Sequence, residues 1–189
     1  MHHTLRQNAF MGFIESVPAY SSLAVYYDAI TIQQSYPVAM EFVIKQLRDI
    51  CPDNLPSNAG RLFTIPVYYG GIDGPDLEDV AKKNGISPEE LIRLHTGTEY
   101  HVYMIGFVPG FPYLGFTHEK LWTERKNSPR LKVLAGSVGL AGNQTGIYPV
   151  EVPGGWQIIG RTTTQLFDAD REQPCLLQTG DRVKFIPAT

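Results

Sequence analysis

The stretch Ala135–Gly160 reads AGSVGLAGNQTGIYPVEVPGGWQIIG, and seven of the chain's eighteen glycines lie in it, at positions 136, 139, 142, 146, 154, 155 and 160. It belongs to a longer region, beginning at Val108, in which short strand-like runs alternate with proline and glycine turns. No convincing helix interrupts that region. This pattern is typical of an antiparallel β-barrel or sandwich, so we expect one in the C-terminal part of the chain.

Upstream of this region, helical and strand-like hydrophobic patterns are mixed. Pro66 lies within a strand-like run and indicates an edge or a bulge, because proline cannot donate to a sheet ladder. Ser87-Pro88-Glu89-Glu90 has the pattern of a capping box that begins a helix. We expect strands at 13–17, 22–27, 61–69 and 98–107, and helices at 35–50, 76–84 and 87–95.

A domain boundary is expected near Pro52–Gly60, the stretch richest in turn-forming residues. The sequence therefore predicts an α+β protein of two parts. A small N-terminal α+β lobe would occupy residues 1–57, and a β-barrel domain would occupy residues 58–189.

Composition excludes several classes of function. Hydrophobic residues make up 43% and charged residues 19%, and the net charge of −3 gives no basic footprint for nucleic acid or an anionic membrane. No apolar run approaches the ~20 residues that cross a bilayer, and no secretory signal is recognisable. Cys51 and Cys175 form no CxxC pair, so we expect reduced thiols, with a disulfide as the alternative. We expect a cytoplasmic protein.

The glycines at 136, 139 and 142 have the spacing G-x-x-G-x-x-G. A Walker loop requires a lysine after its glycines, and no lysine occurs between Val133 and Lys184. The Rossmann fingerprint requires a different spacing and a following helix. Two interpretations stay open: plain tight turns, or backbone nests whose N–H groups bind an anion.

Polar side chains follow the first glycines. Ser137 lies in A-G-S-V-G, which lacks the first glycine of a nucleophile elbow, and no histidine follows His118. A hydroxyl that satisfies a turn is therefore favoured over a catalytic serine. Gln144, Thr145 and Tyr148 either recognise a small polar ligand or form a hydrogen-bonded barrel corner.

The run Phe107–Leu114, FVPGFPYL, is aromatic and stiffened by two prolines. It either forms a loop facing a partner or a pocket, or plugs the core. The candidate partner-surface residues are Phe107, Pro109, Phe111, Pro112 and Tyr113. Trp156 is interpreted as a barrel core residue rather than a stacking platform.

Basic residues cluster at Arg125, Lys126, Arg130 and Lys132, and Arg161 follows the glycine run. Such a cluster is usually a solvated face, but arginines beside glycine turns also suit a phosphate or carboxylate. His95, His101 and His118 have no metal-ligand spacing, and Asp73, Asp76, Glu78 and Asp79 lack the EF-hand pattern. We expect no metal site.

Four motifs in order resemble one family: GFVPGFPYLG at 106–115, SPR at 128–130, AGSVGLAGNQTGIYP at 135–149 and PGGWQIIGRT at 153–162. The family is that of the 5-oxoprolinase B subunit, the kinase-A inhibitor and allophanate hydrolase subunit 1, the carboxyltransferase domain, subdomains C and D. The resemblance covers nearly the whole chain. It implies an α+β lobe followed by a cyclophilin-like antiparallel β-barrel.

The resemblance also implies a function. Together with a paralogous C subunit and an A subunit, the chain would cleave 5-oxoproline to glutamate with hydrolysis of ATP, and would be inactive alone. It would activate the lactam by phosphorylation jointly with the C subunit, with ATP bound by this chain or mainly by the partner. Two alternatives stay open: an inhibitor of a sensor histidine kinase, or a carboxyltransferase subunit of urea metabolism.

Two departures from the family are visible. Family chains usually begin with a further strand, so we expect the lobe to lack its first strand. Leu134 replaces a proline that usually precedes A-G-S-V-G. For the substrate or nucleotide cleft we predict, from glycines, polar side chains and two anion-binding arginines, the set Gly136, Ser137, Gly139, Gln144, Thr145, Tyr148, Arg130 and Arg161.

Overall fold

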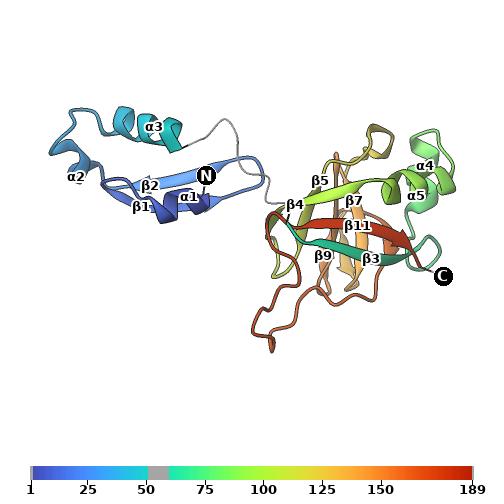
Figure 1. The fold of residues 1–189 in the computed structure, drawn as a ribbon. Coiled ribbons are helices and arrows are strands. Elements are labelled where there is room, and N and C mark those ends of the chain that lie inside the picture. The colour runs from blue at the N-terminus through green and yellow to red at the C-terminus, as the bar shows by residue number, and fades with distance from the viewer. Residues whose placement is uncertain (1, 51–59, 189) are drawn as a thin grey trace. The chain divides into compact units, whose positions relative to one another are not determined.

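A computed structural model describes residues 2–50 and 60–188, and the chain divides into two compact units, Met1–Asn58 and Ala59–Thr189 (Figure 1). Cys51 and the expected linker, except for Gly60, lie outside the described residues. Within the described ranges, no helix is long and apolar enough to cross a membrane.

The first unit is a hairpin packed against helices. Strands β1 (Phe13–Pro18) and β2 (Leu23–Tyr27) pair antiparallel, which confirms both expected strands. Asp28 begins α2 (Ala29–Gln33) because its carboxylate accepts hydrogen bonds from two N–H groups of the first turn. The other helices are α1 (His2–Gln7) and α3 (Ala39–Ile50). A separate hydrophobic core consists of Leu5, Phe10, Ile32, Ala39 and Val43.

The second unit is a closed barrel, which confirms the predicted α+β class with a β-barrel (Figure 1). Its strands follow one another around the barrel in the order β10-β3-β11-β4-β5-β8-β7. The strands of this unit are β3 (Leu62–Tyr69), β4 (Glu99–Ile105), β5 (Pro112–Gly115), β6 (Arg130–Val133), β7 (Ser137–Ala141), β8 (Gln144–Ile147), β9 (Val152–Gly154), β10 (Gln157–Arg161) and β11 (Arg182–Pro187). Its helices are α4 (Leu77–Lys83), α5 (Pro88–Gly97) and the short 3₁₀ helix η1 (Glu119–Leu121).

One pairing differs from the expected antiparallel pattern: β3 and β11 run parallel, whereas the other pairings of described strands are antiparallel. The carbonyl of Val67 accepts a hydrogen bond from Ala188 N. The odd-numbered residues of β3 therefore direct their backbone N–H and C=O groups to β11. Pro66 faces the opposite side, where β10 pairs with β3 only at Tyr68 and Tyr69. The proline therefore lies on a locally unpaired stretch, as its missing N–H requires.

Helices α4 and α5 cover one end of the barrel and agree with the sequence pattern. Ser87 Oγ accepts a hydrogen bond of 3.1 Å from Glu90 N, which caps α5. Gly85 follows α4 with φ of +66°, a left-handed conformation that glycine adopts at little cost. The apolar faces of both helices join the barrel's main core, which includes Leu77, Val80 and Leu91.

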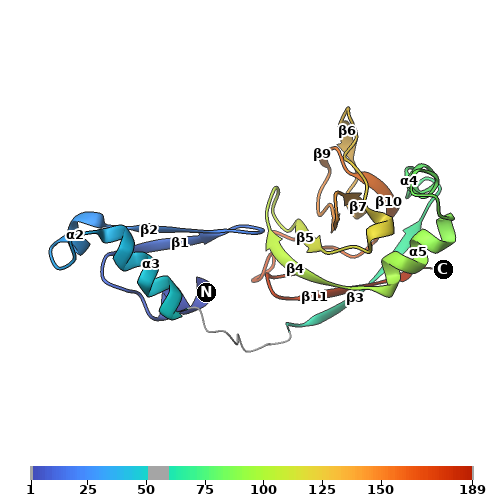
Figure 2. The ribbon, with the colours of Figure 1, turned by 90° about the horizontal axis from the view of Figure 1, so that it is seen from above.

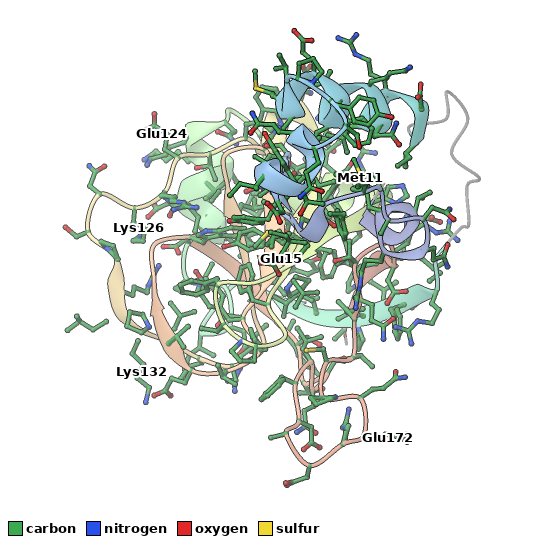
Figure 3. The ribbon with its side chains drawn as sticks, turned by 90° about the vertical axis from the view of Figure 1, so that its left-hand side faces the viewer. Met11, Glu15, Glu124, Lys126, Lys132 and Glu172 are labelled. Carbon is green, nitrogen blue, oxygen red and sulfur yellow. The ribbon has the colours of Figure 1, made fainter. Side chains whose placement is uncertain are left out.

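Strands β6 and β9 form a two-stranded ribbon outside the barrel, with Arg130 opposite Gly154 and Val133 opposite Val152. Figure 2 shows this ribbon standing out from the strands of the barrel. The segment that leads into it carries Glu124 and Lys126, and Lys132 lies on β6 itself (Figure 3). We call β6 and β9 together the ribbon.

Candidate functional site

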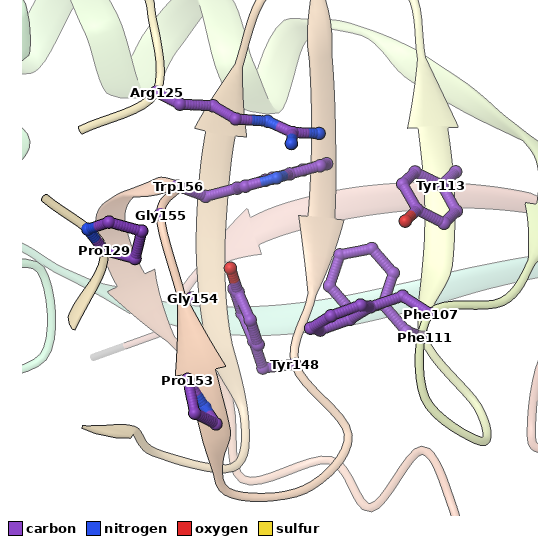
Figure 4. A pocket seen from close by; sticks show the side chains of 10 residues that line it. All are labelled: Phe107, Phe111, Tyr113, Arg125, Pro129, Tyr148, Pro153, Gly154, Gly155 and Trp156. Atoms are coloured by element: carbon purple, nitrogen blue, oxygen red, sulfur yellow. The ribbon is translucent and has the colours of Figure 1, made fainter. Parts of the chain in front are cut away.

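A cavity of about 240 Å³ lies between the ribbon and the outer face of the barrel (Figure 4). Its lining comes from every motif singled out in the sequence: Phe107, Phe111, Tyr113, Arg125, Pro129, Tyr148, Pro153, Gly154, Gly155 and Trp156. We call it the aromatic pocket. Segments that are up to about fifty residues apart in sequence therefore meet at one place.

The glycine array makes room for this pocket. Gly139 on β7 lies directly opposite Gly146 on β8, so two neighbouring positions of the barrel wall carry no side chain. A Cβ on Gly146 would lie 2.9 Å from Phe111 Cζ and 3.0 Å from Trp156 Cζ3, and one on Gly139 would lie 3.1 Å from Trp156 Cβ. These glycines let large rings approach the sheet closely.

The rings of the pocket hold one another in edge-to-face contacts. The Phe111 ring centroid is 5.2 Å from that of Tyr148, 5.4 Å from that of Trp156 and 4.9 Å from that of Tyr113. Such pairs add to the stabilisation that comes from burial alone. Trp156 is 5% exposed, so it is a packed residue, as expected, and at the same time lines the pocket.

Phe107 lies at the mouth of the pocket. Its side chain is 59% exposed, and its ring contacts those of Phe111 and Tyr148. Its φ of 67° places a non-glycine residue in the left-handed region, which strains the backbone. The surrounding turn, in which Phe111 N donates to Val108 O, holds this conformation.

The polar groups of the pocket are mostly donors. Arg125 makes no ion pair with any described residue, and the indole N–H of Trp156 has no hydrogen-bond acceptor among them. Burial raises the pKa of Tyr148, outweighing the opposite effects of the Trp156 backbone N–H and the Arg125 guanidinium, so its hydroxyl keeps its proton. No carboxylate lines the pocket. In Figure 4 the hydroxyl groups of Tyr148 and Tyr113 are directed into the space beside Trp156.

A second cavity, of about 160 Å³, also lies against the ribbon. It is lined by Ile72, Asp73, Pro75, Arg130, Lys132, Val133, Leu134, Ser137, Ile158 and Arg161. We call it the basic cavity. Arg161 donates from Nε to Ala135 O at 3.1 Å, and its Nη1 is 3.8 Å from Asp73 Oδ1. The Nη1 of Arg130 is buried without a partner among the described residues, so one donor of this guanidinium remains available.

Asp76 holds the cations of this region in place, a role that its sequence context did not reveal. Its carboxylate accepts from Lys126 Nζ at 2.9 Å, Arg130 Nη2 at 2.7 Å and Ile158 N at 2.6 Å. Burial alone would raise the pKa of Asp76, but these hydrogen bonds, first that of Arg130, outweigh it and hold the pKa below its ordinary value. The carboxylate therefore stays charged inside the fold.

Four of the eight predicted cleft residues line one of the two cavities. Arg130, Ser137 and Arg161 line the basic cavity, whereas Tyr148 lines the aromatic pocket. Gly136 N donates to Tyr148 O at 2.7 Å and Ser137 N donates to Leu134 O at 3.2 Å. Both N–H groups are thus used within the barrel, and neither is free to form an anion-binding nest.

Gly136 and three other predicted cleft residues, Gly139, Gln144 and Thr145, line neither cavity. Side chains alternate along β8, so Thr145 points into the barrel while its neighbour Gly146 faces the aromatic rings. Thr145 is fully buried, and its hydroxyl contacts His95 Nε2 at 2.9 Å.

His95 is the centre of a buried hydrogen-bond chain. Thr145 Oγ1 donates to Gly139 O at 3.1 Å, so it must accept from His95 Nε2. His95 Nδ1 then accepts from the Tyr69 hydroxyl at 2.7 Å. Burial lowers the pKa of His95 to about 3, which leaves the ring neutral. This histidine is a satisfied core group.

The expected partner surface is only partly on the surface of this chain. Phe107 and Pro109 are exposed and Tyr113 is half-buried, whereas Phe111 and Pro112 are buried. Phe111 packs under the ring cluster, and this is the core-plugging alternative. Within the described residues, no group of three or more His, Cys, Asp or Glu side chains is placed to hold a metal ion.

Comparison with known families and proteins places this fold. Residues 1–177 match the model of the family described as the carboxyltransferase domain, subdomain C and D. The chain belongs to this family. Family membership agrees with the resemblance of its motifs.

Relatives of the carboxyltransferase-domain family are close in sequence. The chain is 46% identical over 188 residues to the 5-oxoprolinase B subunit of Bacillus subtilis, covering 96% of this chain and 78% of that protein. It is 58% identical over 127 residues to the 5-oxoprolinase B subunit of Haemophilus influenzae, covering 67% of this chain and 60% of the relative. The chain thus spans less than two thirds of the latter protein.

A solved structure has the same fold. The crystal structure of a conserved uncharacterized protein from Pyrococcus horikoshii superposes with a TM-score of 0.66 at 40% identity, covering 98% of this chain and 83% of that one. The barrel arrangement is therefore a property of the family and not of this sequence alone.

Proposed function

We propose that this chain is the B subunit of an ATP-dependent 5-oxoprolinase that opens 5-oxoproline to glutamate. The observation that carries the proposal is the convergence of all four family motifs on the aromatic pocket. Two relatives that are 46% and 58% identical are named as B subunits of 5-oxoprolinase. We propose this activity for the complex of subunits and not for the single chain.

The chemistry of the pocket supports dependence on partners. Its lining offers a guanidinium, hydroxyl groups and an indole N–H, but no carboxylate, histidine or thiol that could act as base or nucleophile. Opening a lactam requires activation of its carbonyl and delivery of water. We propose that a paralogous C subunit and an A subunit complete the catalytic groups, and that this chain alone is inactive.

For the nucleotide we propose a role of the basic cavity. Its volume of about 160 Å³ suits a phosphoryl group rather than a whole nucleotide. Arg130, Arg161 and Lys132 would neutralise the charge of a phosphoryl group bound there. The remainder of ATP would then contact the partner subunit. The complex would work in the cytoplasm.

The test is reconstitution. The chain is co-expressed with C and A subunits of a 5-oxoprolinase, and glutamate release from 5-oxoproline is measured with and without ATP. We expect release only from the complete complex and only with ATP. A stable, stoichiometric complex without activity would overturn the proposal. The alternatives, inhibition of a sensor histidine kinase and a role in urea metabolism, remain predictions that no feature of either cavity favours.

A further inference from the structure

We infer that the aromatic pocket binds a small cyclic carboxylate, with Arg125 as the partner of its carboxylate and Tyr148 as a donor to its ring carbonyl. The identification of this ligand as 5-oxoproline rests on the proposed function. The binding site itself rests on the geometry of the pocket alone.

Size and wall chemistry restrict the ligand. Pockets for drug-sized molecules measure roughly 300–1,000 Å³, so a cavity of about 240 Å³ suits a smaller molecule. Phe107, Phe111, Tyr148 and Trp156 present ring surfaces on which a compact, partly apolar ring can pack. The pocket therefore fits a five-membered ring better than an extended chain.

The positive charge in the pocket indicates that the ligand is an anion. Asp76 holds both Lys126 and Arg130, whereas no described carboxylate pairs with Arg125. An arginine presents a rigid fork that matches a carboxylate in a bidentate arrangement. Because no acidic residue lines the pocket, nothing there opposes an anion. The positive charge of this pocket is thus available to a ligand.

A carbonyl is recognised by the remaining donors. The Tyr148 hydroxyl lies against Gly154, where a Cβ would come within 2.5 Å of its oxygen. Its raised pKa keeps it a donor at neutral pH. The Trp156 indole N–H is a second donor without an acceptor among the described residues. A ring carbonyl satisfies such a group, and a plain hydrocarbon ring would not.

The experiment uses the full chain and one of its two tryptophans as a reporter. Trp122 is 53% exposed and lies outside the aromatic pocket, so Trp122→Phe leaves Trp156 as the single tryptophan, whose emission is excited selectively over that of the tyrosines. Titration with 5-oxoproline is expected to change its emission in a saturable way. A flat titration of the folded reporter chain, repeated in the complex, would overturn the inference.

Two substitutions and two analogues separate the contacts. In the reporter chain, Arg125→Gln is expected to weaken the binding of 5-oxoproline at least about tenfold, the size of a lost charge-assisted hydrogen bond. The binding of 2-pyrrolidinone, which has no carboxylate, should be unchanged. Tyr148→Phe is expected to weaken the binding of 5-oxoproline about threefold or more. The binding of cyclopentanecarboxylate, which has no ring carbonyl, should be unchanged. Arg93→Gln is the matched control, because Arg93 pairs with Glu90 on the surface of α5.

The outcomes distinguish this inference from the proposed function. In the active complex, Arg125→Gln is expected to raise KM for 5-oxoproline while Arg93→Gln does not. Activity of the complex with an unchanged KM in Arg125→Gln would overturn the inference and leave the function standing. Saturable binding to the reporter chain, lost in Arg125→Gln, would support the inference even if the complex proved inactive.

Discussion

The aromatic pocket and the basic cavity lie against the same ribbon, yet they hold their cations in opposite ways. In the basic cavity, Arg130 is fixed by the buried carboxylate of Asp76. In the aromatic pocket, Arg125 has no ion pair with a described residue. A paired cation is positioned in advance but partly neutralised, whereas an unpaired one keeps its full charge for a ligand. The basic cavity thus contains a cation in a fixed position, and the aromatic pocket contains one that is available to a ligand.

Asp76→Ala should break the basic cavity and produce the largest effect. It leaves Lys126 and Arg130 without their shared carboxylate and removes the acceptor of Ile158 N. We expect the free energy of unfolding in urea to fall by about 3 kcal/mol. Asp73→Ala is the control, because the contact of Asp73 with Arg161 is long, at 3.8 Å, and both side chains are partly exposed. Equal losses in the two variants would show that Asp76 does not hold the cations.

Gly154→Ala should break the aromatic pocket and spare the basic cavity. The new Cβ would lie 2.5 Å from the Tyr148 hydroxyl and 2.9 Å from two of its ring carbons. Overpacking of this kind costs about 2 kcal/mol, and the displaced ring should also reduce turnover of the reconstituted complex. Gly155→Ala is the matched control for stability, since its Cβ would approach no atom closer than 3.6 Å. A free energy of unfolding that fell equally in both variants would contradict the assignment.

The barrel interior beneath both cavities should respond to pH through His95. Its pKa is lowered to about 3 in the folded chain, whereas an unfolded histidine titrates near 6.5. Below pH 6.5 the unfolded state binds the additional proton, so stability should fall as pH falls, by about 1.4 kcal/mol per unit between pH 6 and 5. Urea unfolding at several pH values measures this slope. His95→Gln should remove it, and a slope that persisted would assign it to another group.

Lys132→Ala sharpens the comparison with the smallest expected effect. Lys132 pairs with Glu151 at 2.8 Å, but both side chains are at least half exposed. Surface ion pairs contribute little, so we expect the free energy of unfolding to change by at most about 0.5 kcal/mol. If the same denaturation assay instead showed a loss near that of Asp76→Ala, the ribbon would depend on its outer ion pair as well.

Local patterns predicted the elements of the fold well. Ser87 and Gly85 mark helix ends through their own side chain and backbone, and Pro66 indicates an unpaired stretch because its nitrogen carries no hydrogen. Each of these signals is a property of one residue and its immediate neighbours. The parallel pairing of β3 with β11 has no such signal, because it joins segments more than a hundred residues apart.

The site was less predictable for the same reason. Gly139 was expected in a cleft, but its role follows from lying opposite Gly146 on the neighbouring strand, which depends on register. Asp76 and Lys126 are separated by 50 positions in the sequence, so no spacing rule joins them. Thr145 and Gly146 are adjacent in sequence, and only the way in which β8 is placed in the sheet decides which of the two faces the rings.

The position of β11 between β3 and β4 has a consequence for synthesis on the ribosome. During translation, β3 and β4 emerge long before Arg182–Pro187, the strand that joins them. Until then both strands present open hydrogen-bonding edges, to which other nascent chains can add. Because closure of the barrel depends on such distant contacts, we expect it to be slow and to require β11. A ribosome-stalled chain ending before residue 182 should therefore remain sensitive to protease.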